Sequence, residues 1–203
     1  MPPLQIIAVI AISAVLGIGS AWLAVVGDVG FEAIRAGAWT AWPTAGADDS
    51  DPYIRARFAR TGELPISAAE GTAFVAAADS SGEMLAGNCD YLITGRTPAA
   101  QWWTLTLYRD ADLSLIANPT ERYGFNSTNI VREPDGSFDI VVAPRARPGN
   151  WLPSDENAKT LRLVFRLYDT PIATGGSVAD IEMPRIKRGI CRCASTSSRS
   201  EGR

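Results

Sequence analysis

The feature that most constrains this chain is an uncharged apolar run at positions 4–26, LQIIAVIAISAVLGIGSAWLAVV. At about 1.5 Å per residue, a helix of this length spans roughly 34 Å and can cross a hydrocarbon core about 30 Å thick. We therefore predict a transmembrane anchor over residues 1–27. A cleaved signal peptide is the alternative, but the run is longer than the usual signal-peptide core and no Lys or Arg precedes it.

The residues that follow this run are poor in basic side chains. Asp28, Glu32 and Asp48 outnumber the cations near the span, so the positive-inside rule places the rest of the chain outside the cytoplasm. We expect a single-pass protein of the bacterial inner membrane with its C-terminal domain in the periplasm. Residues 28–50 are predicted to be a linker, in which Trp39 and Trp42 lie in the lipid headgroup layer or pack onto the domain.

Charge and composition exclude several classes of function. The net charge is -3 and the chain contains no histidine. An acidic chain does not suit nucleic acid, because binding there requires a basic face that neutralises phosphates. The lack of histidine excludes His-dependent catalytic triads and imidazole zinc sites. We accordingly expect no nucleic-acid partner, no metal and no cofactor.

A short helix is predicted at residues 52–60. Asp51 is a good N-cap, Pro52 suits the first helical position, and a threonine and a glycine follow as a stop signal. Ile54 and Phe58 lie on one face, which suggests that the helix docks onto the domain. The arginines at positions 55 and 57 are expected on a solvated side.

The rest of the chain has the pattern of an antiparallel β-protein. The clearest strand is at residues 160–169, where apolar and polar side chains alternate, as in a sheet with one face on a core. Turn signals separate the other segments, including a Pro-Asp-Gly hairpin signal at 134–136. We predict a mainly β fold, an antiparallel jelly-roll-like β-sandwich preceded by one transmembrane helix and the short docking helix. The further strands are expected at residues 72–77, 90–94, 101–108, 114–117, 129–132 and 137–143.

The chain contains three cysteines. Outside the cytoplasm a pair is expected to oxidise, and a bond between Cys89 and Cys191 would tie the C-terminal segment to the sandwich. Cys193 falls in a Ser/Arg-rich stretch, and residues 192–203 are predicted to be a disordered tail. The Cys-x-Cys spacing at 191–193 matches neither a redox motif nor a zinc site.

Six strings together resemble the bacterial domain of unknown function 1214 (DUF1214), over roughly residues 51–191. They are DPYIRARFARTGELP (51–65), the Glu-Gly pair at 70–71, GNCDY (87–91), WWTLTLY (102–108), PRARPGNWLP (144–153) and FRLYDTP (165–171). The resemblance implies a jelly-roll β-sandwich. In longer proteins such a domain often follows a second uncharacterised domain, numbered 1254, whose place is taken here by the apolar run. The family offers no established catalytic residues to carry over.

Three groups of side chains are candidates for ligand binding. Asn150 and Trp151 follow a Pro-Gly turn and could lie over a pocket, or the tryptophan could close the end of the core. Arg166 and Tyr168, with Arg162, share the outer face of the last long strand. That face could receive an anion or line a cavity, or its arginines could pair with acids such as Asp139.

Trp102 is the third candidate. With Tyr108 and Tyr123 it could form an aromatic platform for a sugar or an apolar ligand, or a minor second core.

The leading hypothesis is a non-catalytic binding or envelope accessory module held at the membrane by its N-terminal helix. Its partner would be a small-molecule ligand or an envelope protein. One alternative is a histidine-free hydrolase with paired carboxylates that acts on an envelope glycan, which would require two facing acids with raised pKa values. The other alternative is a docking partner of a separate membrane protein.

Overall fold

Alternating side chains on two long strands determine how the domain packs. The computed structural model describes residues 3–26, 33–67, 69–170 and 181–192. Strands β5 (Trp102–Arg109) and β9 (Leu161–Tyr168) pair antiparallel, with Leu105 opposite Phe165. Their inward residues are buried, as the sequence predicted, and their outward residues are at least partly exposed, except the buried Val164.

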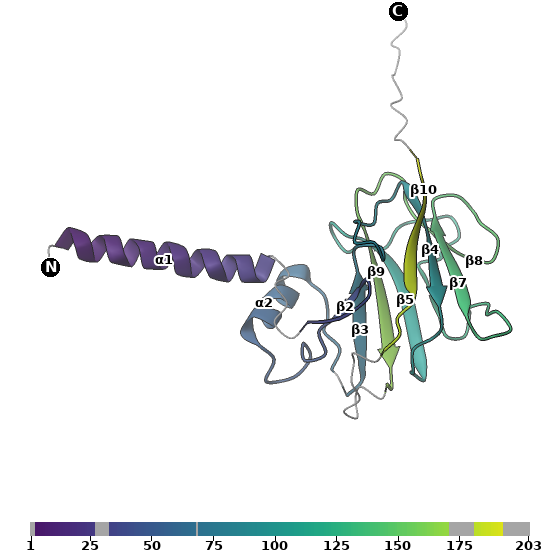
Figure 1. Ribbon diagram of the computed structural model, residues 1–203, viewed down its shortest axis with the longest axis horizontal. Helices are drawn as coiled ribbons and strands as arrows, with labels where there is room; N and C mark the ends of the chain where they lie inside the picture. Colours follow the sequence, from purple (N-terminus) through teal and green to yellow (C-terminus); the bar gives the residue numbers. More distant parts are fainter. Residues whose placement is uncertain (1–2, 27–32, 68, 171–180, 193–203) are drawn as a thin grey trace, which may run out of the picture.

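The described strands form two sheets that face each other as a sandwich (Figure 1). This confirms the mainly β, two-sheet part of the prediction, and the jelly-roll connectivity stays a prediction. The larger sheet has the order β1-β2-β3-β9-β5-β6, and its further strands are β1 (Ile34–Ala36), β2 (Trp39–Ala41), β3 (Gly71–Ala76) and β6 (Gly124–Asn126). The smaller sheet has the order β10-β4-β7-β8, with β10 (Arg185–Cys191), β4 (Cys89–Gly95), β7 (Phe138–Ala143) and β8 (Asn150–Pro153).

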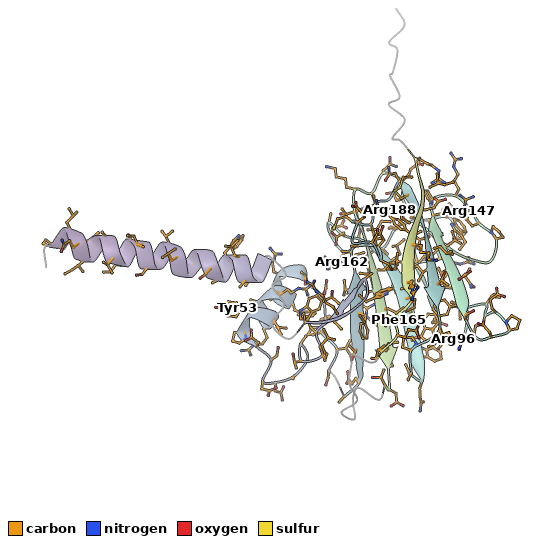
Figure 2. The ribbon with its side chains drawn as sticks, viewed as in Figure 1. Tyr53, Arg96, Arg147, Arg162, Phe165 and Arg188 are labelled. Carbon is orange, nitrogen blue, oxygen red and sulfur yellow. A yellow bond between two sulfur atoms is a disulfide. The ribbon has the colours of Figure 1, made fainter. Side chains whose placement is uncertain are left out.

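Aromatic rings fill the space between the sheets. Trp103 stacks on Phe165 with ring centroids 5.0 Å apart and on Phe138 at 5.5 Å. Trp39 meets Phe165 edge-on at 5.8 Å, and all four side chains are fully buried. Figure 2 shows Phe165 in the middle of the sandwich. The core therefore depends on aromatic contacts from three strands of the larger sheet and one of the smaller.

Several local predictions were wrong. Residues 150–153, expected in a loop, form strand β8. This strand runs parallel to β7 in a fold predicted to be antiparallel, because residues 144–149 carry the chain back along β7 through Gly149 at φ +78°. Residues 114–117 contribute a single bridge at Leu115, and 129–132 form no strand, so the turn at Gly136 does not join two paired strands. The segment predicted as a linker instead contributes the hairpin β1–β2.

The N-terminal helix α1 (Pro3–Val26) and the short helix α2 (Pro52–Thr61) both form where the sequence placed helices. Helix α1 is apolar and long enough to cross a membrane, and its described apolar window is not buried against the domain. In α2, the Asp51 side chain accepts a hydrogen bond from the Tyr53 N–H, and Gly62 ends the helix at φ +71°. Helix α2 lies between α1 and the sandwich (Figure 1).

The predicted disulfide is present and joins strands β4 and β10. Cys89 and Cys191 are opposite each other in the strand register and close a loop of 102 residues. Strand β10 was not predicted, because only Ile186 in it is buried and the apolar alternation that marks a strand is missing. Cys193 and the tail predicted over 192–203 lie outside the described residues, apart from Arg192.

Candidate functional site

A cleft of about 250 Å³ lies on the outer face of the larger sheet. Its floor is formed by side chains of three adjacent strands, Ala73 and Val75 of β3, Val164 and Arg166 of β9, and Tyr108 of β5. Its roof is formed by Trp42, Ala45 and Phe58, together with residues 62–66 that connect α2 to β3. The lining is therefore mostly aliphatic and aromatic.

Helix α2 holds the roof in place through a small second core. Ile54 is buried, and Phe58 meets Trp42 edge-on with ring centroids 6.3 Å apart. Partly buried Val75 of β3 packs against this cluster. Helix α2 thus docks as predicted, and the docking leaves the cleft between its end and the sheet.

Arg57 of α2 was expected in solvent but is only 7% exposed. Its guanidinium carbon lies 3.8 Å from the centroid of the Trp42 ring, a cation–π contact. One of its nitrogens lies 3.7 Å from Glu63. The sequence spacing could have indicated the burial of Arg57, because position 57 lies three residues after the buried Ile54 and so shares its face of the helix.

Two carboxylates beside the cleft are neutralised by arginines. Arg162 reaches Asp110 and Glu63 at 2.6 Å each, and all three side chains are mostly buried. We had suggested Asp139 as an acidic neighbour of Arg162, but Asp139 lies on β7 of the other sheet. Figure 2 shows Arg162 on the side of the sandwich that faces α2.

Arg166 differs from these arginines because it makes no ion pair with the described residues. It lies on the cleft floor, opposite Ala73 on one side and Thr104 on the other. Its guanidinium lies 6.0 Å from the Tyr108 ring centroid. With the charges of Arg57 and Arg162 balanced by Glu63 and Asp110, the side chain of Arg166 leaves one positive charge at an otherwise apolar cleft.

Two more predicted residues share this sheet face. Trp102, which is 44% exposed, pairs with Tyr168 across β5 and β9 at the end of the sheet beyond Arg166. Neither side chain lines the cleft. Trp102 and Tyr108 lie at opposite ends of β5, roughly 20 Å apart at ~3.4 Å per residue, so the structure does not bring them into one aromatic platform.

Asn150 and Trp151 lie on β8 in the other sheet. The buried Asn150 amide accepts from the Val131 N–H at 2.8 Å and donates to the carbonyls of Val131 and Asp139. Trp151 is partly exposed and its indole N–H donates to the Ala143 carbonyl at 2.9 Å. The Asn150 side chain thus connects β8 to β7 and to the loop at Val131, and that of Trp151 connects β8 to the end of β7.

Four described carboxyl groups have a shifted pKa, and in each the pKa is lowered. Burial alone would raise the pKa of both Asp90 and Asp79. For Asp90, hydrogen bonds from Arg192 and Arg147 outweigh the effect of burial. For Asp79, hydrogen bonds from Ser81 and Glu83 in the same turn outweigh it. Hydrogen bonds from the hydroxyl and backbone N–H of Ser137, together with Arg96, lower the pKa of Asp135 to about 2, and those from Ser114 lower the pKa of Asp112. Among the described residues no cluster of three or more acids or cysteines is placed to hold a metal ion.

Fold and cleft together define a β-sandwich protein that follows an apolar N-terminal helix. The chain belongs to the family described as protein of unknown function (DUF1214), whose model matches residues 70–172. No curated protein matches. The matched segment begins at β3 and includes the whole cleft floor, whereas the roof lies before it.

Solved structures similar to this chain include two bacterial proteins. The VPA0106 protein of Vibrio parahaemolyticus aligns at 23% identity over 70% of this chain and 36% of its own, with a TM-score of 0.56. An uncharacterized protein from Burkholderia cenocepacia aligns at 17% identity over 64% of this chain and 32% of its own, with a TM-score of 0.39. The chain therefore spans about a third of each solved protein. The Vibrio structure supports the fold alone.

Proposed function

We propose that this protein is a non-catalytic binding module of the bacterial cell envelope that holds a small ligand in the cleft between α2 and the larger sheet. The single observation that carries the proposal is the cleft itself. Enclosed, mostly apolar hollows with a few polar groups are where proteins bind small molecules, and typical ones measure roughly 300–1,000 Å³. The 250 Å³ of this cleft lies just below that range, so the cleft is suited to a small ligand.

The proposed location is the inner membrane, with α1 as a single-pass anchor and the sandwich in the periplasm. The Cys89–Cys191 disulfide supports an oxidising compartment, since cytosolic thiols stay reduced. The apolar helix supports export, either as an anchor or as a signal sequence. The scarcity of basic residues after α1 supports a domain outside the cytoplasm.

Binding without chemistry fits the acidic groups that the structure describes. A glycan hydrolase with paired carboxylates needs an acid that stays protonated near neutral pH, so its pKa must be raised. The four described carboxyl groups with a shifted pKa have it lowered. Glu63, which lines the cleft, and Asp110 both pair with Arg162. Of the five residues predicted for binding, the proposal retains Arg166.

Filling the cleft tests this proposal. The half-buried Ala73 lies on its floor, so Ala73→Phe should occupy the space, while Ala146→Phe adds the same ring on an exposed loop. Native mass spectrometry of the full chain, gently released from membranes, should show a discrete extra mass on the wild type and on Ala146→Phe. Ala73→Phe should lack it. A bare mass for the wild type, or the same adduct on all three proteins, would contradict the proposal and favour a docking role.

A further inference from the structure

We infer that the ligand is a small apolar carboxylate whose anionic group pairs with Arg166 and whose apolar body lies along Val75 and Val164 beneath Phe58; this inference rests on the proposed function. The juxtaposition that carries it is one guanidinium, without an acidic partner among the described residues, on the floor of an apolar cleft.

The ion pairs around the cleft leave the positive charge of Arg166 without an acidic partner among the described residues. Glu63 is the only acid on the described cleft lining, and it is held by Arg162 at 2.6 Å, with Arg57 at 3.7 Å. Asp110 is held by Arg162 from the other side. A bound anion would therefore meet the positive charge of Arg166 without displacing an existing ion pair, whereas a bound cation would face Arg166 with no free acid.

The chemistry of Arg166 favours a carboxylate among anions. A guanidinium presents a planar fork of N–H donors that matches the two oxygens of a carboxylate. The Tyr108 ring, 6.0 Å from the guanidinium, lies on the same face and helps to orient it. One unpaired cation also suits a single negative charge better than a phosphate monoester, whose charge at neutral pH is closer to two.

The remaining lining defines the body of the ligand. Ala73, Val75 and Val164 on the floor and Phe58 in the roof offer no hydrogen-bonding side chain. An alkyl or aryl group bound against them gains the free energy of apolar burial, and a sugar would leave its hydroxyl groups unpaired there. Helix α2, which carries Phe58 of the roof, lies beside α1, so the carboxylate could belong to a free fatty acid of the membrane or to a short soluble acid (Figure 1).

Calorimetry with three matched probes tests this inference on the full chain in phosphatidylcholine nanodiscs, with empty nanodiscs as the reference. Octanoate should bind at least about tenfold more tightly than octan-1-ol or octylammonium, the ratio that a charge-assisted hydrogen bond contributes. Arg166→Gln should reduce octanoate binding to the level of octanol and leave octanol binding unchanged. Arg166→Lys should restore part of the preference, and Arg145→Gln, on an exposed loop, should behave as the wild type.

The outcomes separate this inference from the proposed function. If octanoate and octanol bind equally, or if Arg166→Gln keeps the preference, the carboxylate inference is wrong while the binding module stands. If no probe binds, or if Ala73→Phe binds octanoate as the wild type does, both are wrong. Where octanoate is preferred, a series from butanoate to palmitate identifies the source. An optimum at short chains supports a soluble acid, and a rise to palmitate supports a free fatty acid of the membrane.

Discussion

Removing the Cys89–Cys191 disulfide should destabilise the domain mainly through its unfolded state. The bond closes a loop of 102 residues, and the chain-entropy relation gives about 4.7 kcal/mol at 25 °C for a loop of that size. The two positions are opposite each other in the β4–β10 register, so serine at both should leave the strand pairing intact. The Cys89→Ser/Cys191→Ser variant should therefore fold with a free energy of unfolding lower by about 4–5 kcal/mol.

Urea unfolding of the full chain in detergent micelles, followed by tryptophan fluorescence, measures this loss. The signal reports the core, because Trp103 and Trp39 are fully buried. The slope against urea should be steeper for the double variant, since an uncrosslinked chain exposes more surface on unfolding. Cys193→Ser, which keeps the bonded pair, is the control and should match the wild type. A loss below about 1 kcal/mol with an unchanged slope would refute the loop-entropy reasoning.

Three further predictions concern single side chains outside the cleft. Asn150→Ala leaves backbone groups without their amide partner, so urea unfolding should show a loss of about 2–3 kcal/mol while octanoate binding stays unchanged. The lowered pKa of Asp90 means that its ionised form stabilises the fold above pH ~4 and that this stabilisation is lost as pH falls through the folded-state pKa. Asp90→Asn should consequently be less stable at pH 7 and show a flatter acid limb; an unchanged limb would contradict the role of the Arg192 contact. The carboxyl resonance of Asp135 should titrate with a pKa of about 2, and Ser137→Ala should raise it toward 3.8, which a pH series by NMR would show.

Much of the fold could be predicted because its longest strands carry strict alternation. In β9, the buried residues Leu161, Leu163 and Phe165 alternate with outward residues, apart from the buried Val164 under α2. The two ends of α2 could also be predicted from the sequence, since the caps Asp51 and Gly62 depend only on neighbouring residues. Such signals depend on neighbours in sequence, and the structure confirmed them.

The missed elements depend on contacts between distant segments. Strand β10 has one buried side chain and is held by its disulfide and by pairing with β4, neither of which leaves an apolar pattern. Strand β8 begins just after a positive-φ glycine and runs parallel to its predecessor, a turn that local propensities do not encode.

The candidate site was predictable only in part. The outer face of β9 with Arg166 was named from alternation, and the possibility that this face lines a cavity followed from it. The roof could not be foreseen, because it requires residues 62–66 and α2 to fold back over the sheet. The burial of Arg57 on Trp42 depends on the same packing. Asn150 and Trp151 were predicted to bind a ligand because they are a polar and an aromatic residue after a Pro-Gly turn. In the structure their side chains donate hydrogen bonds to backbone carbonyl groups of this protein.

The central claim, that the cleft binds a small ligand, is tested most directly by methyl NMR of the full chain in nanodiscs during octanoate titration. Val75 and Val164 line the cleft, whereas Val142 is buried between the sheets and Val15 lies on α1. The account predicts saturable shifts of the Val75 and Val164 methyl resonances, with Val142 and Val15 unchanged. Shifts confined to Val15, or small shifts of equal size throughout, would contradict it.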